Sequence, residues 1–135
     1  MSSDTRQIIV MRKDLGMRRG KQIAQAVHAS MAFLTRNAKV ISPNPWMTDL
    51  YLNVPLKDVE VEWLQNSFTK ICVYVNSEEG LLEIDRQAKA ARITSHVITD
   101  NGTTEFGGVP TVTCLALGPD YKAVLDPITG HLPLF

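Results

Sequence analysis

The sequence predicts a single α/β domain, residues 1–135, in which helices flank a mixed four-stranded sheet. The chain has 135 residues, of which 44% are hydrophobic and 21% charged, and this suits one globular domain with its own core. Short apolar runs alternate with longer segments of helical periodicity, an order typical of strands joined by helical crossovers. Only a short link separates the last two apolar runs, which favours an antiparallel pair within the same sheet.

The first forty residues predict one strand and one helix. The run "RQIIVMR" (6–12) indicates a buried strand, and a loop with two glycines follows it. Helical periodicity extends over 21–36, where large apolar side chains recur at steps of four, four and three residues. Alanines between them allow close packing against the sheet. We therefore expect one inward face, made of Ile23, Val27, Met31 and Leu34.

Residues 38–66 predict a loop and a short helix inserted into the domain. The segment 37–55 contains three prolines and four Asn or Asp residues, so we expect a long irregular loop with one extended piece at "DLYLNV" (49–54). Residues 56–67 have the pattern of a short amphipathic helix that turns Val59 and Trp63 inward.

The rest of the chain predicts three more strands. They are "TKICVYV" (69–75), "TSHVIT" (94–99) and "PTVTCLALG" (110–118). Ser77 can cap a helix that extends to about Ala91, with two glutamates in its first turn. Residues 119–135 predict one or two helical turns and an apolar tail.

The charge pattern limits the partners of the protein. The net charge is zero, yet residues 1–40 hold eight Lys or Arg and two Asp or Glu, whereas residues 41–135 hold six and twelve. This excludes a uniformly basic coat for nucleic acid and leaves room for a local basic site.

Cysteine usage and hydropathy indicate a cytoplasmic protein without a membrane partner. Cys72 and Cys114 each lie inside an apolar run, and we expect both to be reduced. No apolar stretch reaches the length of a membrane span, and the polar N-terminus lacks a hydrophobic signal region.

A polar stripe crosses the predicted first helix. Lys21, Gln25 and His28 are spaced i, i+4 and i+7, so they share one side of the helix. A solvated face is the simpler interpretation. However, alanines and a valine flank Gln25 and His28, and polar groups in a mostly buried helix usually have partners or a function.

Asp100 can be interpreted in two ways, as a turn residue or as part of a ligand site. It ends the predicted third strand, and "DNG" is strong turn chemistry. If the first and third strands are parallel, their carboxyl ends share one sheet edge, where ligand sites of open α/β sheets form. Asp100 would then face Lys21 beside several hydroxyl groups, those of Thr103, Thr104, Thr111 and Thr113.

The start of the first helix gathers cations, although a helix N-terminus disfavours each of them by a few tenths to about 1 kcal/mol. Arg18, Arg19 and Lys21 lie there, and Arg12 and Lys13 precede them. A phosphate-bearing ligand would compensate this charge. The stretch "GMRRGK" is one residue too short for a P-loop, and Gln22 replaces the required hydroxyl. The three histidines, His28, His96 and His131, do not have the spacing of metal ligands.

The segment "IIVMRKDLGMRRGKQIAQAVHAS" resembles the amino-terminal signature of the type 2 (archaeal/eukaryotic-type) peptidyl-tRNA hydrolases. The segments "KICVYVNSEEGLLEI", "ITDNGTTEF", "TVTCLALGP" and "DPITGHLPL" match that family too. The resemblance implies a mixed four-stranded sheet, a homodimer, and hydrolysis of the ester between a peptide and the 3′ end of tRNA, which recycles tRNA in translation and ribosome rescue. It implies no cofactor and no metal.

The resemblance also assigns site residues. The catalytic set falls on Lys21, Gln25, His28, Asp100, Thr104 and Thr113. The stretch "EFGGVPTVT" departs from the family pattern, which leaves Thr111 as a rival of Thr113. We expect Arg12, Lys13, Arg18 and Arg19 to bind tRNA phosphates. The alternative function is a non-catalytic RNA-binding or regulatory interaction module on the same fold.

Overall fold

The computed structural model describes residues 4–46, 48–103 and 105–135. Its strands are β1 (Thr5–Arg12), β2 (Lys39–Ile41), β3 (Tyr51–Asn53), β4 (Thr69–Val75), β5 (Ser95–Asp100) and β6 (Thr111–Tyr121). Its helices are α1 (Arg19–Thr35), α2 (Asp58–Gln65), α3 (Glu78–Ala90) and α4 (Lys122–Thr129).

Four strands form one mixed sheet in the order β4-β1-β6-β5. β1 is parallel to β4 and antiparallel to β6, and β6 is antiparallel to β5. β1 and β5 therefore have the same direction, and their carboxyl ends lie at one edge of the sheet. This confirms the predicted fold class. It also confirms that the first strand and the strand ending at Asp100 run in the same direction, the condition under which we expect Lys21 and Asp100 to meet.

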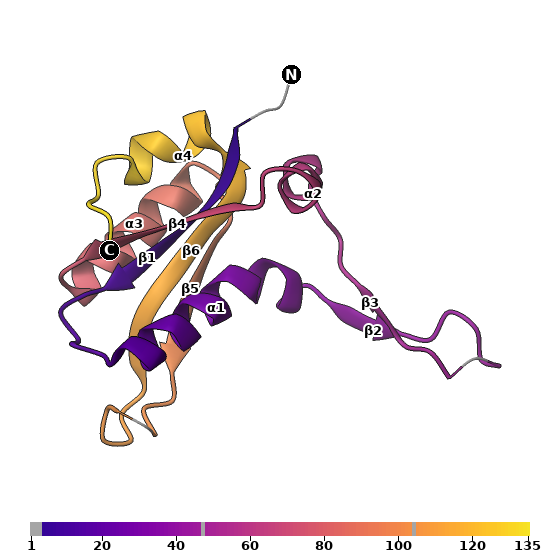
Figure 1. The fold of residues 1–135 in the computed structure, drawn as a ribbon, viewed down its shortest axis with the longest axis horizontal. Coiled ribbons are helices and arrows are strands. Elements are labelled where there is room, and N and C mark those ends of the chain that lie inside the picture. Colours follow the sequence, from indigo (N-terminus) through magenta and orange to yellow (C-terminus); the bar gives the residue numbers. More distant parts are fainter. Residues whose placement is uncertain (1–3, 47, 104) are drawn as a thin grey trace.

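The sheet is covered on both faces, with α1 on one and α3 and α4 on the other (Figure 1). Alternate residues of β1 enter the two cores: Ile8 and Val10 pack with α3 and α4, whereas Ile9 and Met11 pack with α1. Burial on both faces explains why β1 is an unbroken apolar run.

The predicted inward face of α1 is wrong. Ile23, Val27 and Met31 are 59%, 51% and 49% exposed, and Leu34 is half-buried. The buried residues of α1 are instead Gln25, Ala29, Ala32 and Phe33. The small alanine side chains bring the helix axis close to the sheet, and the hydrogen bonds of Gln25 satisfy its amide there. Close approach, rather than side-chain size, sets the rotation of this helix.

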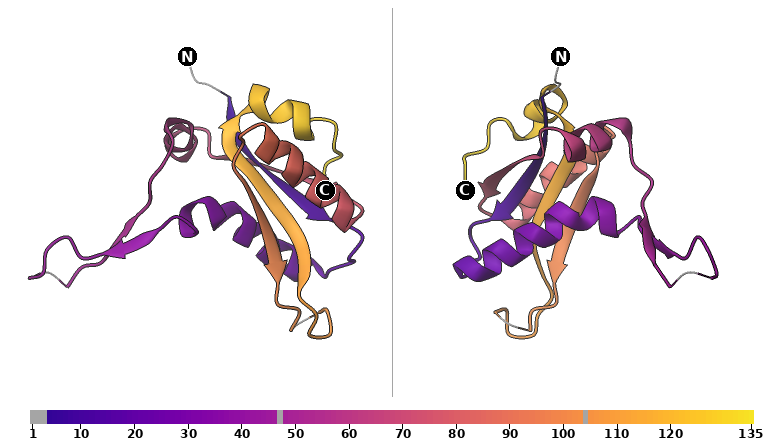
Figure 2. Two further views of the ribbon diagram at one scale, coloured as in Figure 1. Left: turned by 180° about the vertical axis from the view of Figure 1, so that it is seen from behind. Right: turned by 45° about the vertical axis from the view of Figure 1, so that its right-hand side comes forward.

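Residues 38–66 lie largely outside the sheet. β2 and β3 pair as an antiparallel hairpin that projects away from the sheet and its helices (Figure 2). The extended piece at 49–54 is confirmed as β3, but its pairing with 39–41 was not predicted. The prediction for Trp63 is also confirmed: it is 1% exposed, and its indole Nε1 donates to the Thr69 carbonyl over 2.8 Å.

Two further observations concern the rest of the chain. Cys72 and Cys114 are free thiols, as expected, and burial raises the pKa of Cys114 to about 12. Among the described residues, no helix combines the length and apolar character required to span a bilayer.

Candidate active site

A lysine and an aspartate meet where α1 begins and β5 ends. Lys21 lies in the first turn of α1, and Asp100 is the last residue of β5. The Lys21 Nζ donates to Asp100 Oδ1 over 2.8 Å. The two side chains are only 13% and 11% exposed, so the pair is shielded from solvent far more than an ordinary surface salt bridge.

Asp100 is held by two further donors. The Gln25 amide Nε2 lies 3.2 Å from Oδ1, and the backbone N–H of Gly102 lies 2.9 Å from Oδ2. The hydrogen bond from Lys21 is the largest cause that keeps the pKa of the Asp100 carboxyl below its ordinary value of 3.8, and burial acts in the opposite direction. Asp100 is therefore a carboxylate at neutral pH.

Gln25 connects this pair to β6. The Thr113 hydroxyl donates to Gln25 Oε1 over 2.6 Å, and both residues are buried. A continuous chain of contacts thus extends from Thr113 through Gln25 and Asp100 to Lys21. The polar stripe of α1 is accordingly not a simple solvated face, because two of its three members make buried contacts.

The predicted threonines differ in their surroundings. Thr113 reaches the site through Gln25, whereas the Thr111 hydroxyl donates to the carbonyl of Val109 over 2.9 Å. Geometry therefore favours Thr113 over Thr111 as the buried member of the site. Thr104 lies outside the described residues.

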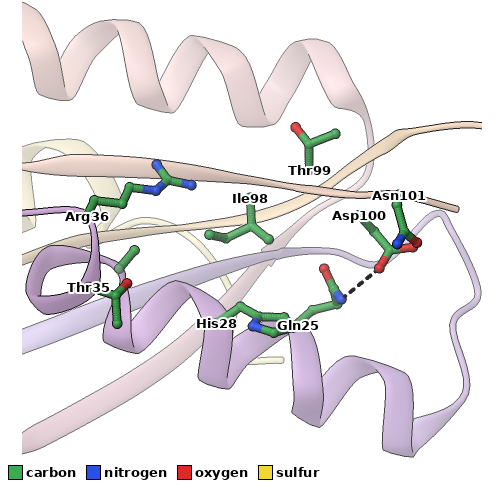
Figure 3. A pocket seen from close by; sticks show the side chains of 9 residues that line it. Gln25, His28, Thr35, Arg36, Ile98, Thr99, Asp100 and Asn101 are labelled. Carbon is green, nitrogen blue, oxygen red and sulfur yellow. Dashed lines mark hydrogen bonds between the residues drawn. The ribbon is translucent and has the colours of Figure 1, made fainter.

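A pocket of 390 Å³ opens beside the pair, between α1 and the end of β5. Its walls come from one side of α1 and from residues 98–101 (Figure 3). His28 is exposed and lines this pocket next to Gln25. The structure therefore brings Lys21, Gln25, His28, Asp100 and Thr113 to one edge of the sheet.

The predicted phosphate-binding residues fall into two groups. Arg18, Arg19 and Lys13 are exposed, with the Lys13 ammonium 4.5 Å from the centre of the Tyr74 ring. Arg12 is different: its guanidinium makes a two-pronged contact with Asp14, at 2.7 and 3.2 Å, and donates to the Val112 carbonyl. At 12% exposure, this side chain is committed to protein contacts.

Sequence reasoning missed Glu105. Its carboxylate lies 3.3 Å from Arg18 Nε and 3.4 Å from the Arg18 backbone N–H, at the N-terminus of α1. This placement offsets part of the positive charge that gathers there. The only available signal was its position five residues after Asp100, in the loop that returns to β6. Among the described residues, no three His, Cys, Asp or Glu side chains are grouped as a metal ion requires.

Comparison with known proteins identifies the family of the chain. The family model described as "Peptidyl-tRNA hydrolase PTH2" matches residues 5–135. A "Peptidyl-tRNA hydrolase" from Methanocaldococcus jannaschii is 37% identical over 128 residues, which covers 94% of this chain and 96% of that protein. One from Thermoplasma acidophilum is 35% identical over 127 residues, with coverage of 94% and 95%. The chain therefore belongs to the peptidyl-tRNA hydrolase PTH2 family.

Proposed function

We propose that this protein is a peptidyl-tRNA hydrolase. It cleaves the ester between a peptide, or an N-blocked aminoacyl group, and the 3′ end of tRNA, and so returns tRNA to translation. The observation that supports this best is the shielded Lys21–Asp100 pair beside a pocket and an exposed basic helix start, in a chain of that family. Phosphate binding alone would not need a carboxylate against the lysine.

In the proposed reaction, water adds to the ester carbonyl carbon and the bond to the ribose oxygen breaks. One proton of the water passes to that oxygen, which leaves as the 3′-hydroxyl, and the other is released to solvent as the peptide leaves as a carboxylate. The Lys21 ammonium stabilises the negative charge that develops on the carbonyl oxygen. Because the pKa of Asp100 is low, this carboxylate is a weak base at neutral pH. We therefore assign it to holding Lys21 and the attacking water in place.

Gln25 and Thr113 position the carboxylate. His28 is not a member of this hydrogen-bond chain. It lies exposed in the pocket wall, and we propose that it contacts the substrate. For Thr104, which the resemblance places in the catalytic set, we propose that the hydroxyl holds the water or the developing oxyanion.

The tRNA end is proposed to lie over the start of α1. Arg18 and Arg19 are exposed there, and backbone N–H groups of a helix start favour phosphate. Lys13 is exposed in the loop between β1 and α1. Arg12 is better explained as a support for the loop between β1 and α1, since its guanidinium is already bound to Asp14 and Val112.

We also propose a cytoplasmic homodimer. An apolar stripe on α1 (Ile23, Val27 and Met31) and the β2–β3 hairpin support self-association, because both expose large apolar side chains that a second copy would cover. Among the described residues of the hairpin, the most exposed large hydrophobic side chains are Val40, Trp46, Leu50 and Leu52, at 67%, 91%, 70% and 60%. Sedimentation equilibrium of the protein and of the double variant Trp46→Ser/Leu50→Ser tests the dimer, and cell fractionation tests the location.

Release of the acyl group from N-acetyl-aminoacyl-tRNA tests the function. We expect turnover by the native protein and its loss in Lys21→Ala and Asp100→Ala, with tRNA binding largely kept. Binding of tRNA by the native protein without any release would contradict the hydrolase and favour the RNA-binding module.

A further inference from the structure

The pocket beside Asp100 continues well past the candidate catalytic pair. One wall follows α1 from Gln25 through His28 and Ala32 to Thr35 and ends at Arg36, the residue after the helix. Asp100 and Asn101 lie at one end and Arg36 at the other (Figure 3). The pocket is therefore a groove along α1, with the Lys21–Asp100 pair at one end.

The direction of this groove indicates which part of the substrate it would hold. Arg18 and Arg19 lie before Lys21 at the start of α1, whereas the groove extends from Gln25 toward the helix C-terminus. If phosphates of the tRNA contact the helix start and the ester lies at Lys21, as the proposed function requires, the acyl part of the substrate points along the groove.

The length of the groove fits a short extended peptide. Arg36, which directly follows α1, lies eleven positions after Gln25, and at 1.5 Å per residue this spans about 16 Å. An extended chain rises about 3.3 Å per residue, so roughly five peptide residues match this length.

The groove offers backbone recognition and little side-chain selectivity. Ala32 and Ile98 are its apolar members, and the remaining lining residues are polar. Its other wall is β5, which is an edge strand of the sheet. Edge strands present N–H and C=O groups to an added chain. One such group, the Val97 carbonyl, already accepts a 2.7 Å hydrogen bond from the Arg36 guanidinium.

We propose that the groove between α1 and β5 binds the peptidyl part of the substrate in an extended conformation. Its carboxyl end lies at Asp100 and its amino-terminal side points toward Arg36. Recognition through the edge of β5 reads the peptide backbone, so peptides of different sequence are accepted. This inference rests on the proposed function and adds to it a site for the peptide.

Substrates of increasing peptide length test the proposal. With native protein, we expect kcat/KM to rise as residues are added to N-acetyl-aminoacyl-tRNA and to level off at about five residues. One or two backbone hydrogen bonds would give a total gain of about tenfold. The gain is expressed as the ratio of kcat/KM for the long substrate to that for the short one.

A matched pair of variants locates the effect. Thr35→Trp fills the far half of the groove from an exposed position at the end of α1 and should bring the ratio close to one. Ala90→Trp places the same side chain at an exposed position at the end of α3, on the opposite face of the sheet, and should leave the ratio unchanged. Circular dichroism and thermal melts verify that both variants are folded.

Photo-cross-linking gives an answer that does not depend on turnover. The probe is a peptidyl-tRNA with an amide in place of the ester and benzoylphenylalanine three residues from it. We expect adducts on Ala32 or Thr35. Adducts confined to the hairpin or to the start of α1 would overturn the proposal.

The outcomes separate the two levels of inference. If the native protein hydrolyses no substrate, the proposed function fails, and the cross-linking still decides where the peptide binds. If it hydrolyses all lengths at the same kcat/KM, or if Thr35→Trp slows the short and long substrates equally, the groove does not hold the peptide and only the further inference fails.

Discussion

The hydroxyl of Thr113 donates a 2.6 Å hydrogen bond to the side-chain oxygen of Gln25, and this contact decides which end of the Gln25 amide faces Asp100. With Oε1 held by Thr113, the NH₂ group is directed to the carboxylate, 3.2 Å away. The reverse orientation would place two oxygens in contact. A buried threonine on β6 thus orients a glutamine on α1, which in turn helps to fix the aspartate on β5.

Thr113→Val removes this hydroxyl while keeping a β-branched side chain of similar shape. Gln25 Oε1 then lacks its buried hydrogen-bond donor, and we expect the free energy of unfolding to fall by about 1–3 kcal/mol. We expect kcat to fall by about ten- to a hundredfold, because Asp100 loses an oriented partner near the reacting atoms. Urea unfolding and single-turnover kinetics measure the two effects.

Thr111→Val is the matched control, since the Thr111 hydroxyl donates only to the nearby Val109 carbonyl at the surface. It should leave both quantities nearly unchanged. Equal effects of the two valine substitutions would contradict the assignment of Thr113 to the site.

The Lys21–Asp100 pair predicts a specific dependence of stability on pH. Because the pKa of Asp100 is lowered in the folded protein, the pair stabilises the fold fully above the ordinary carboxyl pKa of 3.8. That contribution is lost as the pH falls through the lower pKa of the folded state. The difference in unfolding free energy between native protein and Asp100→Asn should therefore be constant near neutral pH and shrink in acid.

Urea titrations across this pH range measure the difference directly. Lys21→Met supplies an independent check, because the cause of the shift is chiefly the Lys21 hydrogen bond. In that variant the Asp100 pKa should return upward toward its ordinary value, and the stability that Asp100 contributes near neutral pH and loses in acid should become smaller. A difference that does not change with pH would show that the pair does not stabilise the carboxylate.

Salt dependence distinguishes the exposed arginines from Arg12. Each phosphate contact contributes roughly 0.7–0.9 to the slope of log affinity against log salt concentration. Arg18→Ala and Arg19→Ala should each weaken tRNA binding and lower this slope by about that amount. Fluorescence anisotropy with labelled tRNA over a salt series provides the measurement.

Arg12→Ala should behave in the opposite way. It removes the contacts with Asp14 and Val112, so we expect a lower melting temperature and an unchanged salt slope. A reduced slope in this variant would return Arg12 to the set that contacts phosphate.

Local pattern and motif spacing predicted the sheet and most residues of the candidate site. They did not predict how α1 is rotated about its axis or which contacts the long loops make. Ile23, Val27 and Met31 obey helical periodicity, but periodicity cannot tell which of two apolar stripes faces the sheet. The burial of Gln25 decided this, and it depends on Thr113, 88 positions away. Glu105 was missed for a similar reason, because its partner Arg18 is 87 residues distant.

The turn after Asp100 provides the last prediction, through the glycine that follows it by two positions. Gly102 has a φ of +82° and its N–H donates to Asp100 Oδ2. A Cβ atom at this position would lie 2.1 Å from the Val109 carbonyl oxygen. Gly16 has a φ of +61°, but a Cβ there meets nothing within 4 Å.

Both Gly→Ala variants incur the strain of a left-handed backbone, about 1–2 kcal/mol, but only Gly102→Ala also forces the loop and its N–H to move. We expect Gly102→Ala to lose more stability than Gly16→Ala and to lower kcat at temperatures where it remains folded, because one donor to Asp100 is displaced. Equal kcat values for the two folded variants would mean that the Gly102 N–H does not help to hold the carboxylate.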